Sequence, residues 1–238
     1  MAVTDARDEH HELLTAQHRP LFQSAFTAYA AWLVRRRFHA LWVRGNLPDT
    51  EAPLVVTSQH VAWWDPLVLL LLRRDWWPRG QYFVMMDQKN LASMKFFRWV
   101  GAFGIDRTRR AGVVSAVKYA VSMSTIPRAR IVIFPQGRQR PMDRRPLDCQ
   151  PGASWIARRA RAQFVPMALR YEFLEDQHPD LFVSIGAPCD APLDDPAAVE
   201  TAITREADAL RDDVHAGRLE SFTRLLRGAG SRDPKRAV

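Results

Sequence analysis

Lysine, cysteine and long apolar runs are scarce in this chain of 238 residues. Its two cysteines, Cys149 and Cys189, stand far apart and form no metal-spaced cluster, which predicts no metal site and fits a reducing compartment. The segment 1–19 is polar, so we expect no secretory signal. The apolar run 67–72 is far shorter than the roughly 20 residues that cross a bilayer, so we expect no membrane-spanning helix.

Arginine supplies nearly all of the positive charge. Only four of the 34 basic residues are lysine, and the formal net charge is +8. A guanidinium group binds phosphate or carboxylate through paired hydrogen bonds. The charge alone fits nucleic acid, an anionic membrane or a phosphorylated substrate. Because the basic residues are scattered and no nucleic-acid-binding motif is present, we expect no nucleic acid partner.

The first quarter of the chain predicts an arm and then a helix. Residues 1–19 are polar and are predicted to be a poorly ordered arm. Residues 20–44 are predicted to be an amphipathic helix, in which aromatic and aliphatic residues recur at helical spacing before the arginine cluster 35–37. The stripe consists of Phe22, Phe26, Tyr29 and Leu33. Such a helix lies in a membrane interface, or it packs on the core with a solvated basic end.

The remaining sequence predicts one large domain, residues 45–228, and a flexible tail, residues 229–238. Strand patterns alternate with helix patterns along this domain, which is typical of an α/β fold with a mainly parallel central sheet flanked by helices. The predicted strands are 54–58, 81–86, 103–106, 130–134, 163–169 and 181–185. The predicted helices are 66–74, 89–100, 111–125, 152–161 and 196–217.

His60 and Asp65 form the most informative pair in the sequence. His60 follows the buried strand pattern 54–58, and Asp65 precedes the helix that Pro66 begins. A histidine takes up a proton near neutral pH, and a carboxylate on its other ring nitrogen fixes the tautomer and stabilises the imidazolium. The pair therefore predicts a base that activates a hydroxyl group. The alternative is an aspartate that only caps the helix, beside an ordinary loop histidine.

Three further segments follow in order. Gly101–Arg107 is a short glycine-bearing strand that ends in an arginine able to hold phosphate, unless Arg107 only pairs with a nearby acid. Phe134–Arg140 is a Pro-x-Gly turn rich in arginine, which is either an anion site or an ordinary exposed turn. Pro166 interrupts the strand 163–169, which predicts an edge strand or a bulge.

Together the four blocks resemble the 1-acyl-glycerol-3-phosphate acyltransferase (PlsC-like) family over residues 50–190. The family pattern is a His-x4-Asp block, a glycine-rich block ending in arginine, a Phe-Pro-Glu-Gly-Thr-Arg-Ser block and a Val-Pro block. They match His60 and Asp65, then Gly101–Arg107, Phe134–Arg140 and Pro166. Residues 45–228 are thus identified as an acyltransferase domain.

The resemblance implies transfer of a fatty acyl group from acyl-CoA or acyl-carrier protein to a lipid hydroxyl, without cofactor or metal. His60 would act as base and Asp65 would orient it. The implied substrate-binding residues are Arg107, Gln136, Gly137, Arg138 and Pro166. The implied partners are a membrane lipid acceptor, the acyl donor and an anionic membrane surface, at the cytoplasmic face of the membrane. Oxyanion donors are expected near Gly137 or at the start of the helix 66–74.

The third block departs from the family. Gln136 replaces the usual glutamate, and Gln139 stands where arginine is expected, so Arg138 or Arg140 would take over that role. This favours a lysophospholipid or related lipid over glycerol-3-phosphate as acceptor. Gln136 also motivates an alternative: a non-catalytic module that binds lipid or acyl carrier. A cysteine nucleophile, Cys149 or Cys189, is a further alternative without a motif-level partner.

Overall fold

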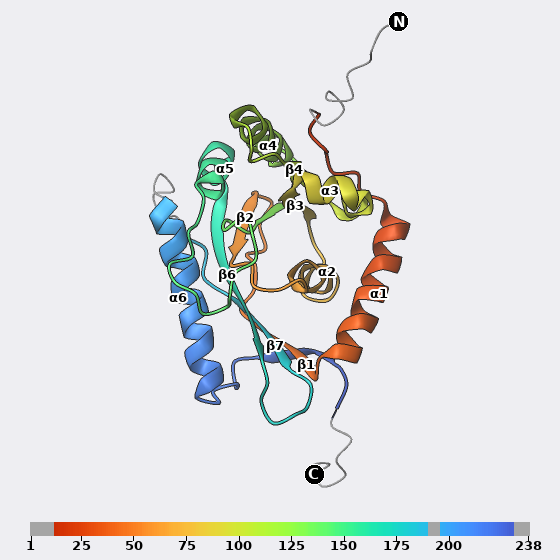
Figure 1. The fold of residues 1–238 in the computed structure, drawn as a ribbon, viewed down its shortest axis with the longest axis vertical. Helices are drawn as coiled ribbons and strands as arrows, with labels where there is room; N and C mark the ends of the chain where they lie inside the picture. Colours follow the sequence, from red (N-terminus) through yellow and green to blue (C-terminus); the bar gives the residue numbers. More distant parts are fainter. Residues whose placement is uncertain (1–11, 190–195, 231–238) are drawn as a thin grey trace, which may run out of the picture.

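An eight-stranded, mostly parallel sheet forms the centre of the computed structural model, which describes residues 12–189 and 196–230 (Figure 1). The strand order is β4-β3-β5-β2-β6-β7-β1-β8. Only the β6–β7 and β1–β8 pairs are antiparallel. The predicted α/β fold with a mainly parallel sheet flanked by helices is confirmed.

The elements follow the predicted alternation along most of the chain. The strands are β1 Ala40–Arg44, β2 Leu54–Ser58, β3 Gln81–Asp87, β4 Ala102–Ile105, β5 Ala129–Ile133, β6 Gln163–Glu172, β7 Asp180–Ile185 and β8 Thr223–Arg227. The helices are α1 Pro20–Arg37, α2 Asp65–Asp75, α3 Gln88–Ser93, the 3₁₀ helix η1 Lys95–Val100, α4 Arg110–Met123, α5 Gly152–Ala160 and α6 Pro196–His215. The helix expected over 89–100 is therefore two short helices, separated at Met94 by non-helical backbone.

The prediction of a helix through residue 44 was wrong. Helix α1 ends at Arg37, and Ala40–Arg44 is a strand between β7 and β8. Phe38 is extended and buried, with its ring 5.0 Å from that of Trp64. Pairing with two neighbouring strands outweighs the helical pattern here, because both sides of β1 find hydrogen-bond partners. Strand β8 was not predicted at all.

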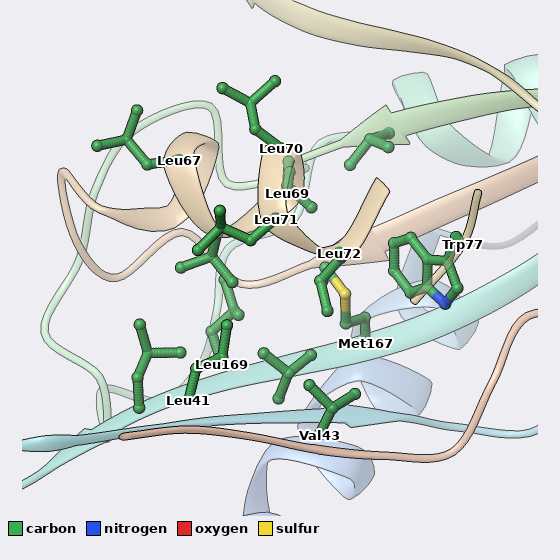
Figure 2. Packing of buried hydrophobic residues seen from close by; sticks show 14 of the residues in the cluster. Leu41, Val43, Leu67, Leu69, Leu70, Leu71, Leu72, Trp77, Met167 and Leu169 are labelled. Atoms are coloured by element: carbon green, nitrogen blue, oxygen red, sulfur yellow. The ribbon is translucent and has the colours of Figure 1, made fainter. Parts of the chain in front are cut away.

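Two helical layers cover the sheet. Helices α1 and α2 lie on one face, and α4, α5 and α6 lie on the other (Figure 1). Figure 2 shows how α2 fits the first face: Leu71 and Leu72 point toward Met167 and Leu169 of β6. Burial of such side chains stabilises the fold by roughly 1.5–3 kcal/mol each. Leu67 and Leu70 point the other way in the same view.

Helix α1 packs on the core with one side and exposes the other. Phe22, Phe26 and Leu33 contact the core, whereas Tyr29 and Trp32 are about half exposed. The exposed rings adjoin the arginines 35–37 of the last turn. The stripe predicted as a membrane face is therefore shared between core and solvent. Within the described part of the chain, no helix combines the length and hydropathy that crossing a membrane requires.

The segment before α1 is held on the sheet. The Gln17 and Arg19 amides donate to carbonyls of Arg98 and Trp99, and the Gly104 amide donates to the Leu14 carbonyl. The prediction of a poorly ordered arm was thus wrong for residues 12–19, because the backbone there finds partners on η1 and β4. Residues 1–11 of the predicted arm and 231–238 of the predicted tail lie outside the described residues.

Of the two alternatives predicted at Pro166, an edge strand or a bulge, the edge strand is wrong, because Pro166 lies in an interior strand. Strand β6 pairs with β2 on one side and with β7 on the other. The proline is tolerated because the ladder to β7 begins only at Met167, and the Pro166 carbonyl still accepts from the Gly186 amide at 2.8 Å.

Candidate active site

The site lies at the carboxyl edge of the parallel strands, where ligands of open α/β sheets bind. His60 follows β2, Asp87 ends β3, Arg107 follows β4, and Phe134 and its turn follow β5. Neighbouring parallel strands bring their carboxyl ends to one edge. The structure therefore brings three of the four sequence blocks together at this edge. His60 and Gln136, for example, are 76 residues apart in the sequence and are joined by a hydrogen bond.

His60 and Asp65 form a direct hydrogen bond. His60 Nδ1 lies 2.6 Å from Asp65 Oδ2. Because a carboxylate accepts, it fixes the proton of neutral His60 on Nδ1 and leaves Nε2 free to take another proton. The His60 side chain is partly exposed to the cavity, while Asp65 is fully buried. This geometry fits a histidine base oriented by a carboxylate.

Asp65 does not cap α2. Its Oδ2 accepts from the Val61 and Ala62 amides at 2.8 and 3.1 Å, both in the loop before the helix. The helix itself begins at Asp65. The carboxylate therefore folds the loop back on itself and holds His60 against it. The alternative of an aspartate that only caps the following helix is wrong.

Tyr171 hydrogen-bonds to this pair, and no sequence pattern predicted its role. Its hydroxyl lies 2.6 Å from Asp65 Oδ1, across 106 residues of chain. Burial raises the pKa of the phenol well above its usual value, and Asp65 raises it further. Tyr171 thus remains protonated and donates to the carboxylate. With Tyr171, both oxygens of the buried Asp65 are satisfied.

The turn after β5 holds His60 from the other side. The His60 amide donates to Gln136 Oε1 at 2.6 Å, and the His60 carbonyl accepts from the Arg140 amide at 2.9 Å. The His60 ring stacks on Phe134 with centroids 4.6 Å apart. Gln136 is buried. An amide oxygen suffices for this contact, which explains how glutamine can stand where the family has glutamate.

Two arginines lie beside His60 on the cavity wall. Arg107 packs against Gly137, whose φ of +66° favours glycine and where any Cβ would collide with the guanidinium. Arg107 also bonds to Asp87 at 3.3 Å. Arg138 is exposed, and no carboxylate among the described residues pairs with it. Arg140 instead is buried and bonds to Asp148, so Arg138 is the arginine that the turn presents to the cavity.

A cavity of about 860 Å³ begins at His60 and runs between α2 and strands β3, β4 and β5. Most of its wall is apolar. Helix α1 contributes Phe26, Tyr29 and Leu33, helix α2 contributes Leu67 and Leu70, and η1 contributes Phe96 and Phe97. Such a cavity is shaped for an apolar ligand whose polar end lies beside His60 and the two arginines.

A family model for acyltransferases matches residues 41–170 of this chain. The chain belongs to the acyltransferase family. The matched span contains the histidine–aspartate pair, both arginines and the Gln136 turn. Tyr171 lies one residue beyond the matched span. A comparison with curated proteins gives no match.

The acyltransferase site leaves Pro166 out. Pro166 is buried on the sheet face opposite α2, near Gly186 and Glu206, whereas Val165 and Met167 face α2. Its predicted substrate-binding role has no support in this geometry, because the strand alternation turns it away from the cavity. The amide of Gly137, expected as an oxyanion donor, already donates to the Phe134 carbonyl at 3.0 Å.

Neither Cys149 nor Cys189 lines the cavity that holds His60, so the alternative of a cysteine nucleophile has no support there. Burial, reinforced by Glu200, raises the pKa of the Cys149 thiol to about 12, which leaves almost no thiolate at neutral pH. Among the described residues, no group of three or more histidine, cysteine or acidic side chains could hold a metal ion.

Proposed function

We propose that this protein is an O-acyltransferase that moves a fatty acyl group from acyl-CoA or acyl-carrier protein to a hydroxyl of a lysophospholipid or related lipid. One observation carries the proposal: the His60–Asp65 pair stands at the polar end of a large apolar cavity. Family membership supports the general class of reaction. The substrates are inferred from the chemistry of the cavity wall.

The proposed reaction needs one base. His60 Nε2 removes the proton of the acceptor hydroxyl while the hydroxyl oxygen attacks the thioester carbonyl carbon. The tetrahedral intermediate then collapses, the carbon–sulfur bond breaks, and the thiolate leaves with the proton returned from His60. The products are an ester and a free thiol. Asp65 stabilises the imidazolium throughout, with its own charge held by Tyr171 and two amides.

The apolar and the charged parts of the cavity favour different parts of the two substrates. The apolar wall favours the acyl chain, since each buried methylene contributes about 0.8 kcal/mol. Arg138 and Arg107 favour an acceptor that carries a phosphate, because Arg138 has no carboxylate partner within the described residues and Arg107 shares Asp87. A lysophospholipid supplies both a hydroxyl and a phosphate.

We further propose that the protein docks at the cytoplasmic face of a membrane as a peripheral enzyme. Exposed Tyr29 of α1 and Trp63 of the His60 loop line the cavity, and the ring of exposed Trp32 stacks on that of Tyr29 with centroids 5.9 Å apart. Leu21, in the first turn of α1, is exposed as well. The arginines 35–37 add attraction to anionic lipid. Docking there would let lipid substrates enter without crossing water.

The decisive experiment compares the unmutated protein with His60→Ala in acyl transfer from palmitoyl-CoA and palmitoyl-carrier protein to lysophospholipids, with products identified by mass spectrometry. We expect loss of at least about 10³-fold in the variant. The matched control is His39→Ala. His39 also pairs with a buried aspartate, Asp180, at 3.1 Å, but it does not line the cavity. That variant keeps its activity.

The alternative is a non-catalytic module that binds lipid or acyl carrier. Ester formation that depends on His60 excludes it. Absence of product from every donor and acceptor, with vesicle binding intact, would instead support the module and overturn the proposed reaction.

A further inference from the structure

The cavity ends at an arginine. One stripe of α2 and its C-terminal extension lines the cavity, and its members are Pro66, Leu70, Arg73 and Trp77. Their spacing of four, three and four residues places them on one helical face. Arg73 follows Asp65 by eight residues, so it lies about 12 Å farther along the helix. The wall therefore begins at the catalytic pair, continues through leucine and ends at a guanidinium group.

Arg73 has no acceptor among the described residues. Its Nη1 is buried without a hydrogen-bond partner, and no carboxylate forms an ion pair with it. Its Cζ lies 5.6 Å from the centroid of the Tyr82 ring. Partial burial lowers the pKa of Arg73. The neighbouring Arg74, by contrast, is paired with Asp75.

A second donor near Arg73 is also without a partner. The indole Nε1 of Trp77, which lines the cavity too, is buried and donates to nothing among the described residues. The Trp77 ring stacks on the Tyr82 ring, over which Arg73 lies. The Tyr82 hydroxyl donates to the Trp77 carbonyl at 2.8 Å, and no hydrogen bond joins it to Arg73. The far end of an otherwise apolar cavity thus holds two unused donors.

Unused donors have an energetic consequence for the ligand. A plain alkyl chain that reached Arg73 would displace water from the guanidinium and give no acceptor in return. Leaving a buried polar group unpaired lowers the affinity for such a ligand, and a charged group lowers it further. A ligand oxygen at the same place would accept from Arg73 and remove that cost.

We propose that the far end of the cavity is a binding site for an oxygen atom carried near the distal end of the acyl chain, as a hydroxyl or a carboxylate. Arg73 is the donor that recognises it. The proposal rests on the proposed acyl transfer, since it assumes that the thioester carbonyl lies at His60. It narrows the donor from fatty acyl thioesters in general to oxygenated ones.

The test is a panel of pantetheine thioesters, the portion that coenzyme A and acyl-carrier protein share. Chains of eight to sixteen carbons end in a methyl, a hydroxyl or a carboxylate group. With the unmutated protein we expect kcat/KM at the best chain length to be at least about tenfold higher for an oxygenated chain than for its methyl counterpart. The hydroxyl and carboxylate arms identify which acceptor the site takes.

Two variants locate the effect. Arg73→Met keeps an unbranched side chain of similar length, removes the donors and should abolish or reverse the preference. Arg74→Met removes the adjacent, carboxylate-paired arginine and should leave the preference unchanged. Thermal unfolding of both variants checks that they fold. If the unmutated protein preferred the methyl-terminated chain at every length, the proposed site would be overturned. A preference for oxygenated chains that Arg73→Met left unchanged would overturn it too, and in both cases acyl transfer would remain supported.

Failure of the proposed reaction would look different, because no thioester would then be turned over. In that case calorimetric titration of the same thioesters into His60→Ala still decides the question. If His60→Ala binds the oxygenated chains more tightly than the methyl-terminated ones, and the double variant with Arg73→Met does not, the proposed site is supported. Equal binding of all chains overturns it.

Discussion

At the scale of single residues, Asp65 organises the site. A fully buried carboxylate is costly unless every charge-bearing oxygen is hydrogen-bonded. Here the two oxygens accept from one imidazole, two loop amides and one phenol. The same contacts that stabilise the charge also hold the histidine, so one side chain meets a structural demand and serves the catalytic role that we propose.

Tyr171→Phe tests this arrangement. The substitution removes one hydrogen bond to a buried carboxylate, so we expect the free energy of unfolding to fall by about 1.5–3 kcal/mol. Asp65 also loses one of the groups that hold it in place against His60 Nδ1, so we expect kcat to fall severalfold with little change in KM. Steady-state kinetics of the proposed acyl transfer measure both constants. An unchanged kcat in the folded variant would show that Tyr171 only supports the fold.

At the scale of elements, α1 has two roles on its two sides. Phe22, Phe26 and Leu33 pack on the core, and the last two also line the cavity, while Tyr29 and Trp32 remain half exposed. Its periodicity predicted a helix correctly as far as Arg37. The pattern could not predict where the helix ends, because the choice of strand for Ala40–Arg44 depends on β7 and β8, which follow more than 130 residues later.

Trp32→Ala should weaken binding to anionic vesicles severalfold without changing turnover of a short, water-soluble donor. The reason is that Trp32 is 50% exposed, next to the basic turn of α1, and an aromatic ring contributes to interfacial binding. Trp155→Ala is the matched control, since Trp155 is 39% exposed on α5, which covers the opposite face of the sheet. Vesicle co-sedimentation measures both. Equal loss in the two variants would argue against α1 as the docking element.

At the scale of the whole molecule, the segment before α1 packs on the edge of the sheet and buries His18 there. His18 stacks edge-on against Phe83 of β3 at 5.2 Å and lies over Gly101. Burial, with a contribution from Arg73, lowers its pKa from 6.5 to about 4. Folding thus favours the neutral imidazole.

This shift predicts how stability depends on pH. Between about pH 6.5 and 4 the unfolded chain binds a proton at His18 that the folded chain does not, so the free energy of unfolding falls as the pH falls through this window. In His18→Leu, the fall in the free energy of unfolding between pH 7 and pH 4.5 should be smaller by about 1–2 kcal/mol, after allowance for the partial exposure of His18. Urea unfolding at pH 7 and pH 4.5 measures it. An identical pH dependence in both proteins would contradict the prediction.

The sequence by itself determined the alternation of strands and helices and the positions of His60, Asp65, Arg107 and the Gln136 turn. These features are local, since strand patterns and turn residues act over a few positions. Only the tertiary structure decided that Tyr171 donates to Asp65, that Pro166 faces away from the cavity, and that Arg73, at the far end of the cavity, has no hydrogen-bond partner within the described part of the chain. Each of these features depends on contacts between distant segments or on which face of a strand or helix is buried. The order of the strands in the sheet determines those contacts and those buried faces, and no single segment can specify that order alone.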